Sequence, residues 1–97
     1  MTDESGADSF VRDIKILNKK GLHARASAKF VQCVERFDAE VWVSKDGQSV
    51  NGTSIMGLMM LAAGIGSFIE VRTSGAEAGT VLEALAALIN DRFGEGE

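Results

Sequence analysis

The chain has 97 residues, of which 45% are hydrophobic and 25% charged, and its formal net charge is −4 at pH 7. These values predict one soluble globular domain with a modest core and exclude a disordered chain. The acidic balance argues against a dedicated nucleic-acid binder, which normally carries a broad basic face. The lone cysteine cannot form an internal disulfide, and no apolar run is long enough for membrane insertion. The polar, acidic N-terminus lacks the features of a signal peptide, so we expect a cytoplasmic protein.

The first half of the chain predicts a strand, a helix and a hairpin. Residues 11–18 partly alternate between apolar and polar types, as in a strand covered on one side. A helix over residues 23–37 follows, and its buried stripe is expected to contain Ala26, Phe30, Cys33, Val34 and Phe37. Alternation resumes over residues 39–44, and the Asp-Gly pair at 46–47 predicts a tight hairpin with residues 48–51 as its return strand.

The second half predicts a short helix, a strand and a longer helix. Residues 55–62 form the short helix, which we expect Gly64 to end. Alternation over residues 67–73 predicts the fourth strand. Ser74 and Glu77 have the spacing of a capping box ahead of the last helix.

The last helix, which we expect Gly94 to close, has an apolar stripe of Val81, Leu82, Leu85, Leu88 and Ile89. One-sided strands and three amphipathic helices predict an α+β fold, an antiparallel sheet with all helices on one face. We assign residues 1–9 to a flexible N-terminal tail and residues 10–97 to a single domain.

The single histidine, His23, lies where a turn gives way to a helix. A helix start presents free backbone N–H groups and the positive end of the helix dipole, and it therefore attracts anions such as phosphate. No acidic residue occurs between Asp13 and Glu35, whereas five basic residues do: Lys15, Lys19, Lys20, Arg25 and Lys29. The combination predicts an imidazole that carries or contacts a phosphoryl group, because neutral imidazole is nucleophilic near pH 7.

Two segments, GLHAR at residues 21–25 and SIMG at residues 54–57, resemble the two signatures of the HPr family. These proteins are the histidine-containing phosphocarriers of the bacterial phosphoenolpyruvate-dependent phosphotransferase system. The similarity covers residues 11–93 in the family's element order and implies an open-faced β-sandwich, a four-stranded antiparallel sheet with three helices. It also implies that Nδ1 of His23 accepts a phosphoryl group from enzyme I and passes it to an EIIA-type domain. Such a carrier is not an enzyme and needs no cofactor, because its partners catalyse both transfers.

Further residue roles follow from the same two segments. Arg25, two positions after the histidine, is placed to neutralise phosphoryl oxygens with its planar guanidinium. Ser54 is a helix cap by sequence, and the resemblance implies that a regulatory HPr kinase/phosphorylase modifies it. The resemblance places partner contacts at Leu22, Ala24, Lys29, Ile55, Met56 and Met59.

The sequence also departs from the family and leaves alternatives open. Ala26 stands where the family usually has proline, which predicts a less rigid helix start. The carbon-uptake and nitrogen-related branches of the system both remain open, as do two other functions: a non-phosphorylated HPr-like binding module and a small anion-sensing domain. One histidine and one cysteine predict no metal site. We expect a monomer with an exposed Trp42 and an inert, buried Cys33.

Overall fold

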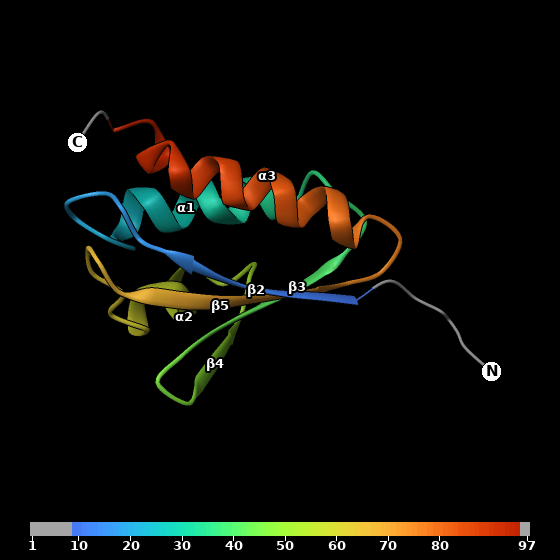
Figure 1. The fold of residues 1–97 in the computed structure, drawn as a ribbon, viewed down its shortest axis with the longest axis horizontal. Helices are drawn as coiled ribbons and strands as arrows, with labels where there is room; N and C mark the ends of the chain where they lie inside the picture. The colour runs from blue at the N-terminus through green and yellow to red at the C-terminus, as the bar shows by residue number, and fades with distance from the viewer. Residues whose placement is uncertain (1–8, 96–97) are drawn as a thin grey trace.

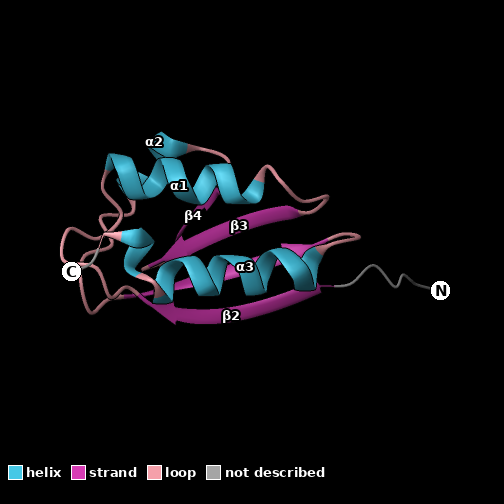
Figure 2. Cartoon of the chain, turned by 90° about the horizontal axis from the view of Figure 1, so that it is seen from above, coloured by secondary structure: helices cyan, strands magenta, loops and turns pink. Residues whose placement is uncertain are grey.

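The computed structural model describes residues 9–95 and contains one four-stranded sheet with helices packed on it. The strands are all antiparallel in the order β2-β5-β3-β4. Helices α1 and α3 lie side by side across one face of the sheet, and α2 packs beside α1 and against β4 (Figures 1 and 2). The elements are β2 (Ser9–Lys15), α1 (Ala24–Val34), β3 (Glu40–Lys45), β4 (Gln48–Asn51), α2 (Ile55–Met60), β5 (Phe68–Ser74), α3 (Ala78–Asn90) and the 3-10 turn η1 (Arg92–Gly94). This confirms the expected open-faced β-sandwich.

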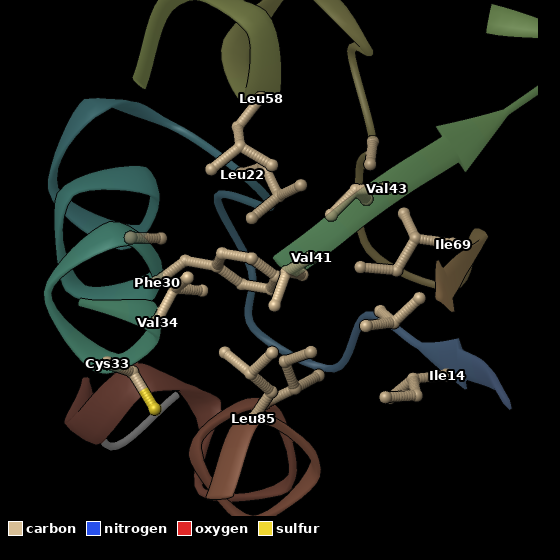
Figure 3. Packing of buried hydrophobic residues seen from close by; sticks show 14 of the residues in the cluster. Ile14, Leu22, Phe30, Cys33, Val34, Val41, Val43, Leu58, Ile69 and Leu85 are labelled. Atoms are coloured by element: carbon tan, nitrogen blue, oxygen red, sulfur yellow. The ribbon is translucent and has the colours of Figure 1, made fainter. Parts of the chain in front are cut away.

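The core lies between the sheet and the two long helices. Alternate strand residues point toward the helices, so Ile14, Val43 and Val71 are buried whereas their chain neighbours face outward. Phe30 of α1 and Leu85 of α3 are fully buried and point into this layer (Figure 3). Apolar burial of this kind is the main driving force that holds the helices on the sheet.

The opposite face of the sheet is exposed, as the one-sided pattern predicts. Trp42 projects there with 41% of its surface accessible, which confirms its expected exposure. Cys33 is buried beside α3 (Figure 3), and burial raises the pKa of its thiol, an effect that the charge of Arg36 offsets only in part. A thiol with a raised pKa is a poor nucleophile, consistent with the inert core role expected for Cys33.

Helix α1 ends three residues earlier than predicted. Its regular part stops at Val34, and the next residues form tighter turns in which the N–H of Phe37 bonds to the carbonyl of Val34. Phe37 packs against the core and is only partly buried. The helical spacing of apolar residues in the sequence continues to Phe37, although the α-helical backbone ends at Val34, so the spacing predicted too long a helix.

Helix α2 ends at a residue other than the expected one. It stops at Met60, and Ala62 adopts the left-handed conformation with φ of 52° that was expected of Gly64. The N–H of Ala62 bonds to the carbonyl of Met59. An alanine rarely takes this position, so the sequence pointed to the nearest glycine instead.

The capping box expected at the start of α3 is absent. Glu77 is the N-cap residue but makes no side-chain cap, and Ser74 still belongs to β5. The Glu77 carboxylate instead accepts a hydrogen bond of 2.7 Å from the backbone N–H of Asp38, in the loop before β3. A tertiary contact has therefore replaced the local one.

The boundaries at the two ends of the chain also differ from prediction. Helix α3 ends at Asn90, and Gly94 closes η1 instead. The first strand, predicted over residues 11–18, covers Ser9–Lys15 instead, so it ends three residues early and reaches one residue into the segment assigned to the tail. Residues 1–8 lie outside the described part. No helix within residues 9–95 is both long and apolar enough to cross a membrane.

Candidate functional site

A tight turn sets the position of His23. Gly21 has a φ of 64°, and a Cβ built there would lie 2.2 Å from the carbonyl oxygen of Ala63, so only glycine fits. The next residue, Leu22, donates its N–H to that same oxygen at 2.9 Å. The loop before α1 is thereby fixed to the loop after α2.

His23 is itself the N-cap of α1. Its backbone is extended, with φ of −75° and ψ of −178°, and its Nδ1 accepts a hydrogen bond from the backbone N–H of Arg25 at 3.2 Å. The imidazole remains accessible, with 24% of its side chain exposed. Because Nδ1 is an acceptor, the proton of a neutral ring resides on Nε2. The nitrogen that the family resemblance assigns to the phosphoryl group is therefore unprotonated and faces the helix start.

The other ring nitrogen meets a carboxylate that sequence reasoning missed. Nε2 of His23 lies 2.6 Å from Oε2 of Glu95, whose side chain is only 8% exposed. The second carboxylate oxygen accepts a bond of 3.2 Å from Nδ2 of Asn18. Burial raises the pKa of Glu95, but the hydrogen bonds from His23 and Asn18 and the charges of His23 and Arg25 together lower it more, so the pKa lies below its ordinary value of 4.5. Glu95 is therefore ionised at neutral pH.

The chain reaches this position by an unusual reversal after α3. Arg92 and Phe93 both have left-handed backbones, with φ of 54° and 55°, followed by Gly94 at 74°. Phe93 is fully buried, and Lys29 of α1 donates to its carbonyl oxygen at 2.6 Å. The end of α3 and η1 thus lie at the same end of the molecule as the loop leading into α1 (Figures 1 and 2).

No local sequence pattern predicts the contact between His23 and Glu95. His23 and Glu95 are 72 positions apart, and the residues around Glu95 do not form a recognisable motif. One feature of the sequence could have indicated it: Phe93 is an aromatic residue just past the end of an amphipathic helix. Such residues are usually buried, so the chain after the helix is expected to pack against the domain. Asn18 was missed for the same reason, although it is fully buried.

Basic side chains gather beside Glu95, the carboxylate that contacts His23. A hollow next to Glu95 is lined by Lys20, Arg25 and Lys29. Arg25 is exposed, whereas Lys29 is partly buried and bound to the carbonyl of Phe93. Three of the five predicted basic residues therefore lie together beside Glu95, and Lys29 also anchors the C-terminal turn.

Apolar side chains lie next to the histidine itself. A second hollow brings His23 together with Leu22 and with Met59 of α2. Met56 is 71% exposed and Ile55 and Met59 are each 40% exposed, so α2 presents apolar surface to solvent. Ala24 is exposed at the helix start. Leu22 is 5% exposed and packs in the core, which leaves it little surface for a partner.

Ser54 occupies the start of α2 in the way His23 occupies the start of α1. Its hydroxyl oxygen accepts the backbone N–H of Gly57 at 2.9 Å, and its own N–H bonds to the carbonyl of Asn51. The expected cap is confirmed.

Among residues 9–95, no group of three or more His, Cys, Asp or Glu side chains gathers to hold a metal ion.

Comparisons with known proteins agree with this geometry. The family described as "PTS HPr component phosphorylation site" matches residues 10–91. The phosphocarrier protein HPr of Neisseria meningitidis is 57% identical over 89% of this chain and 97% of the relative, and that of Cupriavidus necator is 54% identical over the same shares. A crystal structure of HPr from Thermoanaerobacter tengcongensis superposes with a TM-score of 0.85 at 41% identity, covering 89% of this chain and 97% of the other. The chain therefore belongs to the HPr family of phosphocarrier proteins of the phosphotransferase system.

Proposed function

We propose that this protein accepts a phosphoryl group from phosphorylated enzyme I on Nδ1 of His23 and passes it to an EIIA-type protein in the cytoplasm. The observation that carries the proposal is the pair of contacts of the ring: Nδ1 accepts the backbone N–H of Arg25 at a helix start, whereas Nε2 lies 2.6 Å from the carboxylate of Glu95. A neutral imidazole with its lone pair on Nδ1 is a competent nucleophile. The carrier is not an enzyme, because its partners supply the catalysis.

The groups around the ring have complementary roles. The N–H of Arg25 that now donates to Nδ1 becomes available to a phosphoryl oxygen after transfer, and the helix dipole favours the added negative charge. The guanidinium of Arg25 and the amines of Lys20 and Lys29 line the adjacent hollow and attract the anionic group. The exposed Met56 and the half-exposed Met59 offer an adaptable apolar surface to successive partners.

Incubation with enzyme I and phosphoenolpyruvate, followed by intact mass measurement, tests the proposal. We expect one added phosphoryl group that mild acid removes, that alkali does not, and that His23→Ala abolishes. A folded wild-type protein that gains no mass with enzyme I from the same organism would contradict the carrier function. It would favour the non-phosphorylated binding module.

We propose further that phosphorylation of Ser54 slows this transfer. Phosphoserine adds a charge of about −1.5 to −2 at the start of α2, where the helix end stabilises it. The same charge lies on the apolar surface of Ile55, Met56 and Met59 that an enzyme I molecule approaches, and it repels an acidic partner there.

Substitution by aspartate tests the regulatory proposal without the kinase. We expect Ser54→Asp to raise the KM for phosphoryl uptake from enzyme I. Thr80→Asp is the matched control, because Thr80 is exposed in the first turn of α3 and receives the same charge away from α2. Equal rates for the two variants would contradict the regulatory role.

A further inference from the structure

The carboxylate of Glu95 lies against the edge of His23 that carries Nε2, while Nδ1 on the other edge faces the start of α1. An incoming phosphoryl group at Nδ1 does not have to displace Glu95. On the basis of the phosphocarrier function proposed above, we propose that Glu95 is a positioning residue for phosphoryl transfer. It holds the proton of His23 on Nε2 and stabilises the positive ring that forms when Nδ1 is phosphorylated.

Both hydrogen bonds of the ring select the same tautomer. An ionised carboxylate only accepts hydrogen bonds, so Glu95 requires a proton on Nε2. The N–H of Arg25 only donates, so it requires a lone pair on Nδ1. The 2.6 Å bond to Glu95 is short, as charge-assisted bonds are, whereas the 3.2 Å bond from Arg25 is longer and more easily broken.

The charge balance of the transfer explains why a carboxylate is useful here. The Nδ1 lone pair forms the bond to phosphorus, and the bond from phosphorus to the phosphorylated protein donor breaks with its electron pair returning to the donor. Nε2 keeps its proton, so the ring acquires a positive charge. Glu95 faces that charge at hydrogen-bond distance, as the buried carboxylate of a catalytic triad faces its imidazolium.

The surrounding structure holds Glu95 in place. Asn18 is fully buried and uses its amide group to bond both the carbonyl of Gly21, at 2.8 Å, and the carboxylate of Glu95, at 3.2 Å. The left-handed backbones of Arg92 and Phe93 are unfavourable for residues with a Cβ, and burial of the Phe93 ring offsets that cost. This reversal of the chain places the carboxylate of Glu95 against Nε2 of His23.

The single histidine makes the proton position directly measurable. In protein labelled with nitrogen-15 in the imidazole, we expect a protonated Nε2 with slow solvent exchange and an unprotonated Nδ1. Glu95→Gln retains an acceptor oxygen and is expected to keep this pattern, whereas Glu95→Ala is expected to speed the exchange of the Nε2 proton. A proton on Nδ1 in the wild type, or unchanged exchange in Glu95→Ala, would overturn the proposal.

Transfer kinetics separate the charge from the hydrogen bond. Glu95→Gln removes only the charge, and we expect it to slow phosphoryl uptake from phosphorylated enzyme I by about tenfold, a modest value because the site is partly exposed. Glu95→Ala is expected to be at least as slow. The matched control is Glu83→Gln, which removes the same charge from an exposed pair with Arg12 and is expected to transfer at the wild-type rate.

The outcomes distinguish this inference from the proposed function. Normal or faster uptake by both Glu95 variants would overturn the role of Glu95 and leave the phosphocarrier function standing. Absence of uptake by the wild type would overturn the phosphocarrier function and, with it, the role of Glu95 in transfer. The exchange measurement on the unphosphorylated protein would still decide whether Glu95 holds the proton.

Discussion

Helices α1 and α2 each begin at a residue proposed to carry phosphate, but they are built very differently. Helix α1 has eleven residues and buries six of them, Ala26, Ser27, Phe30, Val31, Cys33 and Val34. Helix α2 has six residues and buries only Leu58. A reactive atom has to be held in a fixed geometry, whereas a docking surface benefits from adaptable side chains. The well-packed helix α1 therefore holds the reactive histidine, and the exposed helix α2 provides the docking surface.

The two capping side chains differ in the same way. His23 is held on both edges of its ring, by the N–H of Arg25 and by Glu95 from the C-terminal turn. The Ser54 hydroxyl bonds the N–H of Gly57 within its own short helix. We therefore expect changes at His23 to act on the chemistry and changes at Ser54 to act on helix stability and partner approach.

The largest expected effect is the loss of phosphoryl uptake in His23→Asn. Asparagine is among the best N-cap residues, so the variant keeps an acceptor for the helix start but has no nucleophilic nitrogen. We expect no acid-labile phosphoryl group by intact mass, and a loss of stability in urea denaturation that is limited to the lost contact with Glu95. His23→Ala is expected to lose the same activity and about 1 kcal/mol of stability with the cap. Residual acid-labile phosphorylation in His23→Asn would place the acceptor elsewhere.

The next largest effect is on stability, and it compares a buried residue of α1 with an exposed residue of α2. Phe30 is fully buried, so Phe30→Ala leaves a cavity and is expected to cost about 3–5 kcal/mol. Met56 is 71% exposed, so Met56→Ala is expected to change stability by less than about 0.5 kcal/mol. Urea midpoints measure both, and a large cost for Met56→Ala would show that α2 contributes to the core through more than Leu58.

Ser54→Ala is expected to have a smaller effect. Loss of the bond to the N–H of Gly57 removes a cap worth about 1 kcal/mol. Because α2 has one buried residue, we expect faster hydrogen exchange confined to α2, with phosphoryl uptake on His23 retained. Faster exchange across α1 as well would indicate that the two helices unfold as one unit.

The fold could be predicted from the sequence because its periodic patterns are strong. Alternation placed β2, β3 and β5, the Asp-Gly pair placed the return strand β4, and the stripe around Phe30 placed α1 on the sheet. The errors lie at the ends of elements, in the bounds of β2 and at the helix ends, where tertiary contacts decide. Ala62 took the left-handed position expected of a glycine, and Glu77 bonded the loop before β3 rather than its own helix.

The site could be predicted only where its residues are neighbours in the chain. His23 and Arg25 fall in one short motif, and Ser54 is a cap by position. Glu95 meets His23 because of a left-handed reversal at Arg92 and Phe93, and residues with a Cβ rarely adopt that backbone. Leu22 shares a motif with His23, yet its side chain is buried in the core.

The smallest expected effect concerns acid, and it tests the extra contact that distinguishes His23 from Ser54. The folded-state pKa of Glu95 lies below its ordinary 4.5, so its ionised form is stabilised by folding. That stabilisation is fully present above the ordinary pKa and is lost as the pH falls through the lowered value. We expect wild type to be more stable than Glu95→Gln near pH 7, with the difference shrinking as the pH falls below the ordinary 4.5.

Urea denaturation of both proteins at several pH values measures this difference. Glu83 is the necessary control, because its hydrogen bond with Arg12 also lowers its pKa and its contribution disappears in the same direction. Its pair with Arg12 joins α3 to β2 and is exposed, so Glu83→Gln reports the behaviour of a surface pair. Glu95 contacts the imidazole and Glu83 does not, so the Nε2 proton should exchange faster with solvent once Glu95 is protonated, in wild type and in Glu83→Gln alike. An Nε2 proton whose exchange does not respond to the titration of Glu95 would show that the carboxylate does not hold the ring.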